Sequence, residues 1–319
     1  MARIILIETS TALCSVALAE DGRIVAYKES ETPRAQASLT APFVKDLLDE
    51  RGIGVRDCDA VCVSKGPGSY TGLRVGVSTA KGLCFGAGIP LIAVGTLDTL
   101  VYQAADSSLL SVAPKDLPSG TPGTSVTSVT PGTPGTPVTS GTSTPFASGF
   151  RYIVPMVDAR RMEVYTAVFT PDGRQLTETR PQVIESLSQI IGTPSPSLPS
   201  SPSGFSSDLT ASTFNLSSED KPVAHDPHFS TGLPSSPEGI SFADLLAEGQ
   251  VLFIGDGAGK CREVLAHPNA HFAQCCPKAS AMLRPAFAAW NARRFEDTAY
   301  FEPFYLKDFI ATVPRKKLF

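Results

Sequence analysis

The chain has 319 residues, 42% of them hydrophobic and 18% charged, and a formal net charge of −4. It is long enough for one large or two small globular domains, and its charge gives no general attraction to nucleic acid or to an anionic membrane. The opening residues MARIILIETS hold an apolar run too short for a signal peptide, and no stretch approaches the roughly 20 apolar residues that span a bilayer. We therefore expect a cytoplasmic protein without a membrane partner.

The seven cysteines are scattered and form no CxxC pair. This usage predicts reduced thiols, most of them buried, rather than a disulfide framework or a cysteine-based metal site.

Two segments differ from the rest in composition. Residues 111–149 and 193–240 are rich in Pro, Gly, Ser and Thr and contain few large apolar side chains. Such segments bury too little surface to offset their ordering entropy, so both are predicted to be disordered insertions. The prediction is a first lobe at 1–110 and a second lobe at 150–319, which the later insertion interrupts.

The sequence of the first lobe predicts three strands, followed by alternating helices and strands. The first strand is residues 4–7, and two more are joined across Asp21-Gly22, a strong hairpin signal. A helix follows at 34–51 because apolar residues recur at spacings of four, and Gly52 ends it. The remaining elements are a strand at 60–64, a helix at 73–88, a strand at 89–94 and a helix at 96–105.

The second lobe repeats this order in part. Its predicted strands are 152–158 and 163–169, and residues 251–259 are predicted as a strand entering a glycine turn. Its predicted helices are 183–191, 241–248 and 278–295. The order predicts an α/β fold of two ribonuclease-H-like lobes, the actin, sugar-kinase and Hsp70 (ASKHA) architecture, in which ATP can bind between the lobes.

The glycine-rich segment KGPGSYTG (65–72) lies between a predicted strand and a predicted helix. Such a segment can hold a phosphate, but no lysine follows Gly72 as a P-loop requires, and Pro67 lacks an N–H donor. We favour a structural turn built by Gly66, Pro67, Gly68 and Gly72, with a phosphate cradle as the alternative.

The helix predicted at 73–88 has apolar residues nearly all round its axis. Such a helix is either central in a core or shared with a partner. With the helix at 34–51 it could form half of an intermolecular helix bundle. The candidate interface residues on these two helices are Leu39, Phe43, Leu47, Leu73, Gly76, Val77, Ala80 and Leu83.

Six segments in order resemble the TsaB family (formerly YeaZ), bacterial proteins of tRNA threonylcarbamoyladenosine (t6A) biosynthesis. They are ETSTALCSVALAEDG, SKGPGSYTGLRVGVSTAKGL, GIPLIAVGTLDTL, VDARRMEVYTAVF, FIGDGA and YFEPFYLKDFIAT. The resemblance implies a non-catalytic subunit that pairs through its first-lobe helices with a catalytic TsaD-type subunit. It also implies a TsaE-type ATPase as a further partner, tRNA contact through the complex, and a homodimer as an alternative state of the free protein.

The resemblance also bears on metal and nucleotide binding. Thr96 and Leu100 stand where the catalytic paralogue has two metal-binding histidines, so we expect no metal site. The four histidines, at 225, 228, 267 and 271, form no convincing pair. Many relatives have histidine at the position of Gln36, which the resemblance adds to the candidate interface residues. Family members more often have Asp at the position of Glu8.

No cofactor is assigned, with ATP or ADP at the complex interface as the alternative. Its candidate contacts are Glu8, Ser10, Gly255 and Gly257. An actin-like ATPase or kinase with a degenerate cleft is the alternative function, whereas a metalloprotease would need an HExxH motif that the chain lacks. In DARRMEVY, Asp158 beside Arg160 and Arg161 predicts an ion-paired turn, with an anion-binding site as the alternative.

Overall fold

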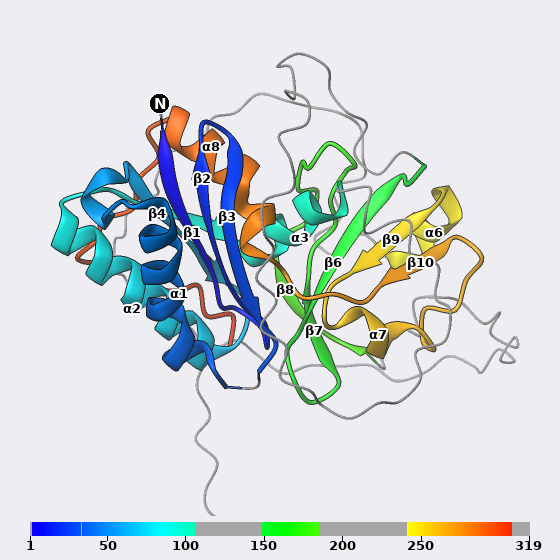
Figure 1. Ribbon diagram of the computed structural model, residues 1–319. Helices are drawn as coiled ribbons and strands as arrows, with labels where there is room; N and C mark the ends of the chain where they lie inside the picture. The colour runs from blue at the N-terminus through cyan, green and yellow to red at the C-terminus, as the bar shows by residue number, and fades with distance from the viewer. Residues whose placement is uncertain (1, 33, 106–148, 185–240, 308–319) are drawn as a thin grey trace, which may run out of the picture.

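The computed structural model describes residues 2–32, 34–105, 149–184 and 241–307 (Figure 1). The two predicted insertions, apart from Gly149, and the predicted helix from residue 185 onward lie outside these ranges. Among the described residues, no helix is long and apolar enough to cross a membrane.

The first sheet has the strand order β3-β2-β1-β4-β5. Its strands are β1 (Arg3–Glu8), β2 (Cys14–Glu20), β3 (Arg23–Ser30), β4 (Ala60–Gly66) and β5 (Leu91–Gly95). Strands β1, β2 and β3 form an antiparallel meander, while β4 and β5 run parallel to β1. The predicted hairpin is confirmed, because Asp21 and Gly22 both have positive φ, as a tight two-residue turn requires.

Three helices belong to this part of the chain: α1 (Gln36–Arg51), α2 (Tyr70–Ala87) and α3 (Thr96–Ala104), with a 3-10 turn at Val55–Asp57. The first two end at Gly52 and Gly88, whose left-handed backbone closes each helix. Both pack on the sheet face that carries Ile5, Ile7 and Val63.

The second sheet has the order β10-β9-β6-β7-β8. Its strands are β6 (Tyr152–Asp158), β7 (Glu163–Thr166), β8 (Arg180–Val183), β9 (Val251–Ile254) and β10 (Ala270–Ala273). Strands β6 to β8 are antiparallel neighbours, whereas β9 and β10 run parallel to β6. Because this repeats the first sheet strand for strand, the predicted pair of ribonuclease-H-like lobes is confirmed.

The second lobe differs from its prediction in four places. Strands β8 and β10 were not predicted, and β7 ends at Thr166 rather than residue 169. The predicted helix 278–295 is a 3-10 turn (Ala279–Met282) continued by α8 (Leu283–Asn291), which ends because Arg293 takes a left-handed conformation. The other two helices are α6 (Phe242–Glu248) and the short α7 (Ala258–Cys261).

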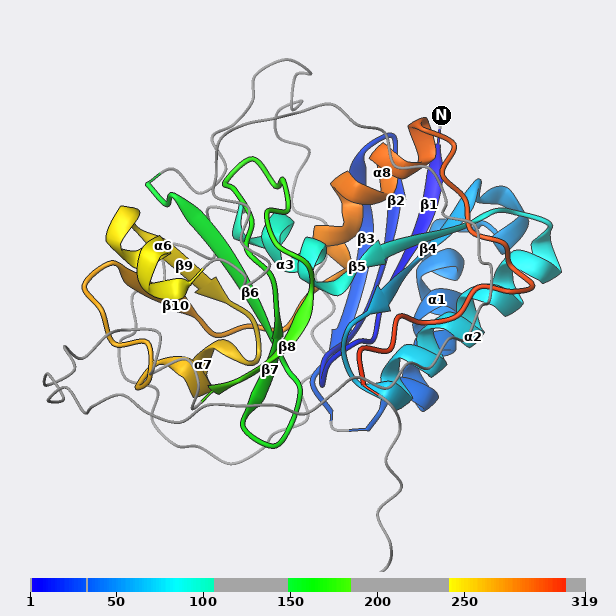
Figure 2. The ribbon, with the colours of Figure 1, turned by 180° about the vertical axis from the view of Figure 1, so that it is seen from behind.

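Helices α3 and α8 lie between the two sheets (Figures 1 and 2). Helix α3 packs against β6 of the second sheet, whereas α8 packs against β1 and β5 of the first. Met282 and Ala286 thereby cover the sheet face that carries Ile4 and Leu6, opposite α1 and α2. The lobe limits of 1–110 and 150–319 stay predictions. Residues 279–291, predicted as part of the second lobe, pack on the first sheet.

The chain then returns along the first lobe as the C-terminal strap (residues 294–307), drawn in red beside α2 in Figure 2. Glu296 N donates to Leu91 O at 2.9 Å and Phe304 N donates to Lys65 O at 2.7 Å. Lys81 on α2 donates to the carbonyls of Ala299 and Phe301, at 3.0 Å each. The strap therefore covers the β5 edge of the sheet.

Candidate partner interface on the first lobe

The glycine-rich segment joins β4 to α2 and packs on the β1–β2 turn. Ser69 caps α2, because its Oγ accepts from Gly72 N at 3.3 Å. The amide of Ser69 donates to Ser10 O at 2.6 Å, and Thr9 Oγ1 donates to Gly72 O at 2.8 Å. These bonds fix the start of α2 against residues 9 and 10.

The glycines permit this close approach. A Cβ at Gly68 would lie 2.3 Å from Ser10 O, one at Gly72 would lie 2.1 Å from Thr9 O, and one at Gly76 would lie 2.3 Å from Thr9 Oγ1. The chain's own residues 9 and 10 fill the space at these glycines, where a phosphate would have to lie. The geometry favours the structural turn over the phosphate cradle.

Gly66 and Pro67 lie at the buried start of the same turn. Gly66 has a φ of 109°, and a Cβ there would lie 2.7 Å from Phe304 O of the C-terminal strap. The turn is therefore held on both sides, by the β1–β2 turn and by the strap.

Most of the predicted interface residues face inward. Leu39 and Leu83 are partly buried against the core, and Gln36 Nε2 donates to the carbonyls of Thr11 and Ala12 at 2.9 and 3.1 Å. The buried members are Phe43, Leu47, Leu73, Gly76, Val77 and Ala80. These residues hold α1 and α2 on the sheet, so a partner would meet a different face of the two helices.

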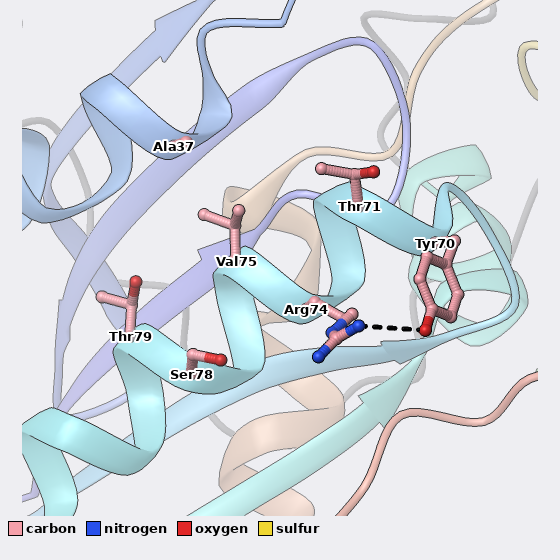
Figure 3. Close-up of a pocket in the computed structure, with 7 residues that line it drawn as sticks. All are labelled: Ala37, Tyr70, Thr71, Arg74, Val75, Ser78 and Thr79. Carbon is pink, nitrogen blue, oxygen red and sulfur yellow. Dashed lines mark hydrogen bonds between the residues drawn. The ribbon is translucent and has the colours of Figure 1, made fainter.

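That face carries a shallow groove of about 430 Å³ between α1 and α2 (Figure 3). We call it the α1–α2 groove; it is lined by Ala37, Tyr70, Thr71, Arg74, Val75, Ser78 and Thr79. Arg74 Nη1 donates to Tyr70 Oη at 3.0 Å, and the Tyr70 ring packs 4.9 Å from that of Tyr305. Farther along α2, the side chain of Phe85 is 89% exposed.

Sequence reasoning missed these lining residues because α2 is apolar on several sides. Val75 and Val77 look alike in the sequence, yet only the latter is buried in the core. The spacing of Thr71, Ser78 and Phe85 at seven residues was the available signal for the outer face.

The candidate nucleotide residues of the first lobe are buried at the end of β1. Glu8 Oε1 accepts from Ser10 N at 2.7 Å, and burial raises the pKa of Glu8 to about 7. Among the described residues, Glu8 Oε2, Ser10 Oγ and Thr11 Oγ1 have no hydrogen-bond partner. The cluster is polar and enclosed.

The second-lobe candidates follow β9. A Cβ at Gly255 would lie 2.2 Å from Met156 O, and one at Gly257 would lie 2.8 Å from Val164 Cγ1. Between them, Asp256 Oδ1 accepts from Asp158 N at 2.9 Å, and burial raises the pKa of Asp256 to about 6. These glycines, like those after β4, are in close contact with the chain's own strands.

The structure places Thr96 and Leu100 in the core, with Thr96 Oγ1 2.9 Å from Ser64 Oγ. His267 Nδ1 accepts from Asn269 N at 3.1 Å in a turn, and His271 lies on β10. Within the described ranges, no group of three or more His, Cys, Asp or Glu side chains could hold a metal ion. His225 and His228 lie outside those ranges.

The two sheets share one topology, and each is covered in part by a helix from the other half of the chain, α3 on the second sheet and α8 on the first. This arrangement defines a two-lobed α/β fold of the actin, sugar-kinase and Hsp70 type. The YeaZ structure from Pseudomonas aeruginosa superposes with a TM-score of 0.58, covering 96% of this chain and 100% of that one at 20% identity. At this identity the likeness establishes the fold.

Sequence similarity to curated relatives covers about a third of the chain. The TsaB proteins of Escherichia coli and Bacillus subtilis, named as tRNA threonylcarbamoyladenosine biosynthesis proteins, are 42% and 35% identical over 102 and 97 residues. These matches cover 32% and 30% of this chain and 44% and 42% of the relatives, so they span less than half of either protein.

A family model for TsaD, tRNA N6-adenosine threonylcarbamoyltransferase, matches residues 30–113. The transferase resemblance thus covers the part of the first lobe that contains both α1 and α2. The fold and these partial sequence matches together make the chain similar to the TsaB (YeaZ) proteins.

Proposed function

We propose that this chain is the non-catalytic partner subunit of a TsaD-type transferase that forms threonylcarbamoyladenosine in tRNA. The observation that carries the proposal is the α1–α2 groove with the exposed Phe85. The helix pair lies within residues 30–113, the stretch that resembles the transferase family itself. Two chains with similar helix pairs can pack these faces against each other about a pseudo-twofold axis.

The composition of the groove suits helix packing. Ala37, Val75, Ser78 and Thr79 are short side chains, which let a second pair of helices approach closely. Phe85 supplies a large apolar side chain of the kind that anchors protein interfaces. A TsaE-type ATPase, a homodimer of the free chain, and nucleotide at the complex interface remain predictions from the family resemblance.

The test is pairing and activity with the transferase of the same organism. Ser78→Arg places a charged side chain in the groove without touching the core, and we expect at least a tenfold loss of affinity. Ala247→Arg is the matched control, since Ala247 is exposed on α6 of the second lobe.

Threonylcarbamoyl transfer to tRNA should require the chain and should fall with Ser78→Arg but not with Ala247→Arg. Transfer that proceeds equally well without the chain would refute the proposed function. Unchanged pairing of Ser78→Arg would refute the groove as the interface.

A further inference from the structure

The connection between β6 and β7 has an unusual backbone. Arg160, Arg161 and Met162 have φ values of 62°, 48° and 57°, so three consecutive non-glycine residues are left-handed. Each such residue costs about 1–2 kcal/mol relative to a right-handed one, and glycine would avoid that cost. The turn is closed by Ala159 N donating to Glu163 O and by Glu163 N donating to Arg160 O, at 3.1 and 3.0 Å.

The carboxylates beside this turn are paired with lysines from elsewhere in the chain. Asp158 pairs with Lys260 of α7 at 2.5 Å, and Glu163 pairs with Lys307 at the end of the strap. Asp158 also accepts the backbone N–H of Arg160 at 2.7 Å. The predicted ion pair between Asp158 and the neighbouring arginines is therefore wrong, because the Asp158 carboxylate pairs with Lys260 instead.

The two guanidinium groups are left without an ion pair among the described residues, and both arginines are exposed. Met162, 50% exposed, lies beside them, and β8 ends next to it, where Ile184 N donates to Met162 O at 2.9 Å. We call residues 160–162 the β6–β7 tip.

The duplicated fold provides an internal comparison. The β1–β2 turn occupies the same topological position in the first lobe, but its residues Thr9, Ser10 and Thr11 are buried and uncharged. The same connection in the second lobe is strained and exposed, and its two positive charges have no ion pair within the described part of the chain. Folding alone does not explain these arginines, because Asn or Gly would suit the backbone better.

We propose that the β6–β7 tip binds the sugar–phosphate backbone of an RNA, which under the proposed function is the tRNA substrate. Guanidinium groups bind phosphate oxygens through paired hydrogen bonds, and backbone contacts of this kind position a nucleic acid. The net charge of −4 makes such a local site necessary for RNA contact. A three-residue tip with one exposed apolar side chain is far smaller than the 20–30 residues that each side of a protein interface uses.

The α1–α2 groove lies on the first lobe and the tip on the second. Distinct variants can therefore separate RNA binding from pairing with the transferase.

The experiment measures binding of an unmodified tRNA transcript to the complex of this chain with its transferase. Arg160→Asn/Arg161→Asn removes both charges with a residue that tolerates the left-handed conformation, so the variant should fold at least as well. Arg23→Ala/Arg56→Ala is the charge-matched control, since both side chains are exposed on the first lobe. Arg160→Lys/Arg161→Lys keeps the charge but loses the paired donors.

We expect the asparagine variant to bind tRNA at least tenfold more weakly, with the slope of log K against log salt reduced by about 1.5. The lysine variant should recover part of the affinity, and the control should match the wild type. Pairing with the transferase should be unchanged in all three.

Unchanged tRNA affinity of the asparagine variant, with pairing intact, would overturn the RNA site and leave the proposed function standing. Loss of a protein partner with tRNA affinity unchanged would instead make the tip a protein contact. Failure of the wild type to pair with the transferase would count against the proposed function itself.

Discussion

Glu8 is a carboxyl group enclosed at the end of β1, and its titration is linked to stability. Its pKa is raised from 4.5 to about 7, first by burial. Between these pH values the folded chain holds a proton that the unfolded chain has released. Stability from this group is therefore present at low pH and is lost as the pH rises toward and through 7.

Glu8→Gln should remove that dependence. From pH 5 to pH 8, the free energy of unfolding of the wild type should fall relative to the variant by roughly 2 to 3 kcal/mol. Urea unfolding at the two pH values measures the difference. Asp256, with a pKa of about 6, contributes the same pH dependence to both proteins, so its contribution cancels in the difference between their unfolding free energies. Parallel curves for the two proteins would contradict the assignment.

A second residue-scale prediction concerns the glycines of α2. Gly72→Ala brings a Cβ to within 2.1 Å of Thr9 O, a backbone atom, so α2 must shift off the β1–β2 turn. We expect destabilisation of about 1–3 kcal/mol, as for overpacked core positions. Gly82→Ala on the same helix has no atom within 4 Å and should stabilise by about 0.5–1 kcal/mol. Urea midpoints give both values, and equal effects would contradict the packing argument.

Among the elements, the C-terminal strap is attached to α2 through one side chain, Lys81, that can be removed without touching the sheet. Lys81→Ala removes both hydrogen bonds to Ala299 and Phe301, and should cost about 1–2 kcal/mol, since charge-assisted bonds to carbonyls exceed neutral ones. Amide exchange should speed up across residues 296–304. Lys45→Ala removes only an exposed pair with Asp49 on α1 and should change neither quantity. Strap exchange unaffected by Lys81→Ala would show that the backbone hydrogen bonds of Glu296 and Phe304 and the packing of Phe301 suffice to hold the strap.

The sequence predicted most of the first lobe and less of the second, for physical reasons. Strands β1 and β4 are apolar runs, and Asp21-Gly22 and Gly52 are turn signals that act locally. By contrast, β8 reads RPQV, with no buried alternation, and β10 follows a Pro-Asn turn. Both owe their strand conformation to pairing with β7 and β9, which no local pattern encodes.

The candidate site shows the same division. The close-packing role of KGPGSYTG could be predicted, because glycine and proline act on the backbone nearby. For the exposed face of α2, the seven-residue spacing of Thr71, Ser78 and Phe85 was the only local signal, because Val75 and Val77 look alike in the sequence. Nor could the pairing of Asp158 with Lys260, which are distant in sequence and meet only in the folded second lobe.

At the scale of the whole molecule, the two sheets repeat one topology, but each depends on the other half of the chain. The face of the first sheet opposite α1 is covered by Met282 and Ala286, and α3 covers β6. Neither lobe, cut at the predicted boundary, carries its complete core.

This dependence predicts that residues 1–110 alone will not fold cooperatively. Without residues 279–291, the apolar face that includes Ile4, Leu6 and Ile92 is left open to water, and an exposed face of that size favours association. We expect a broad urea transition and binding of a hydrophobic dye, whereas the full chain unfolds in one sharp transition. A peptide of residues 278–307 added in trans should sharpen the fragment's transition, and a scrambled peptide should not. A fragment that unfolds sharply by itself would mean that α1 and α2 suffice to stabilise the first sheet.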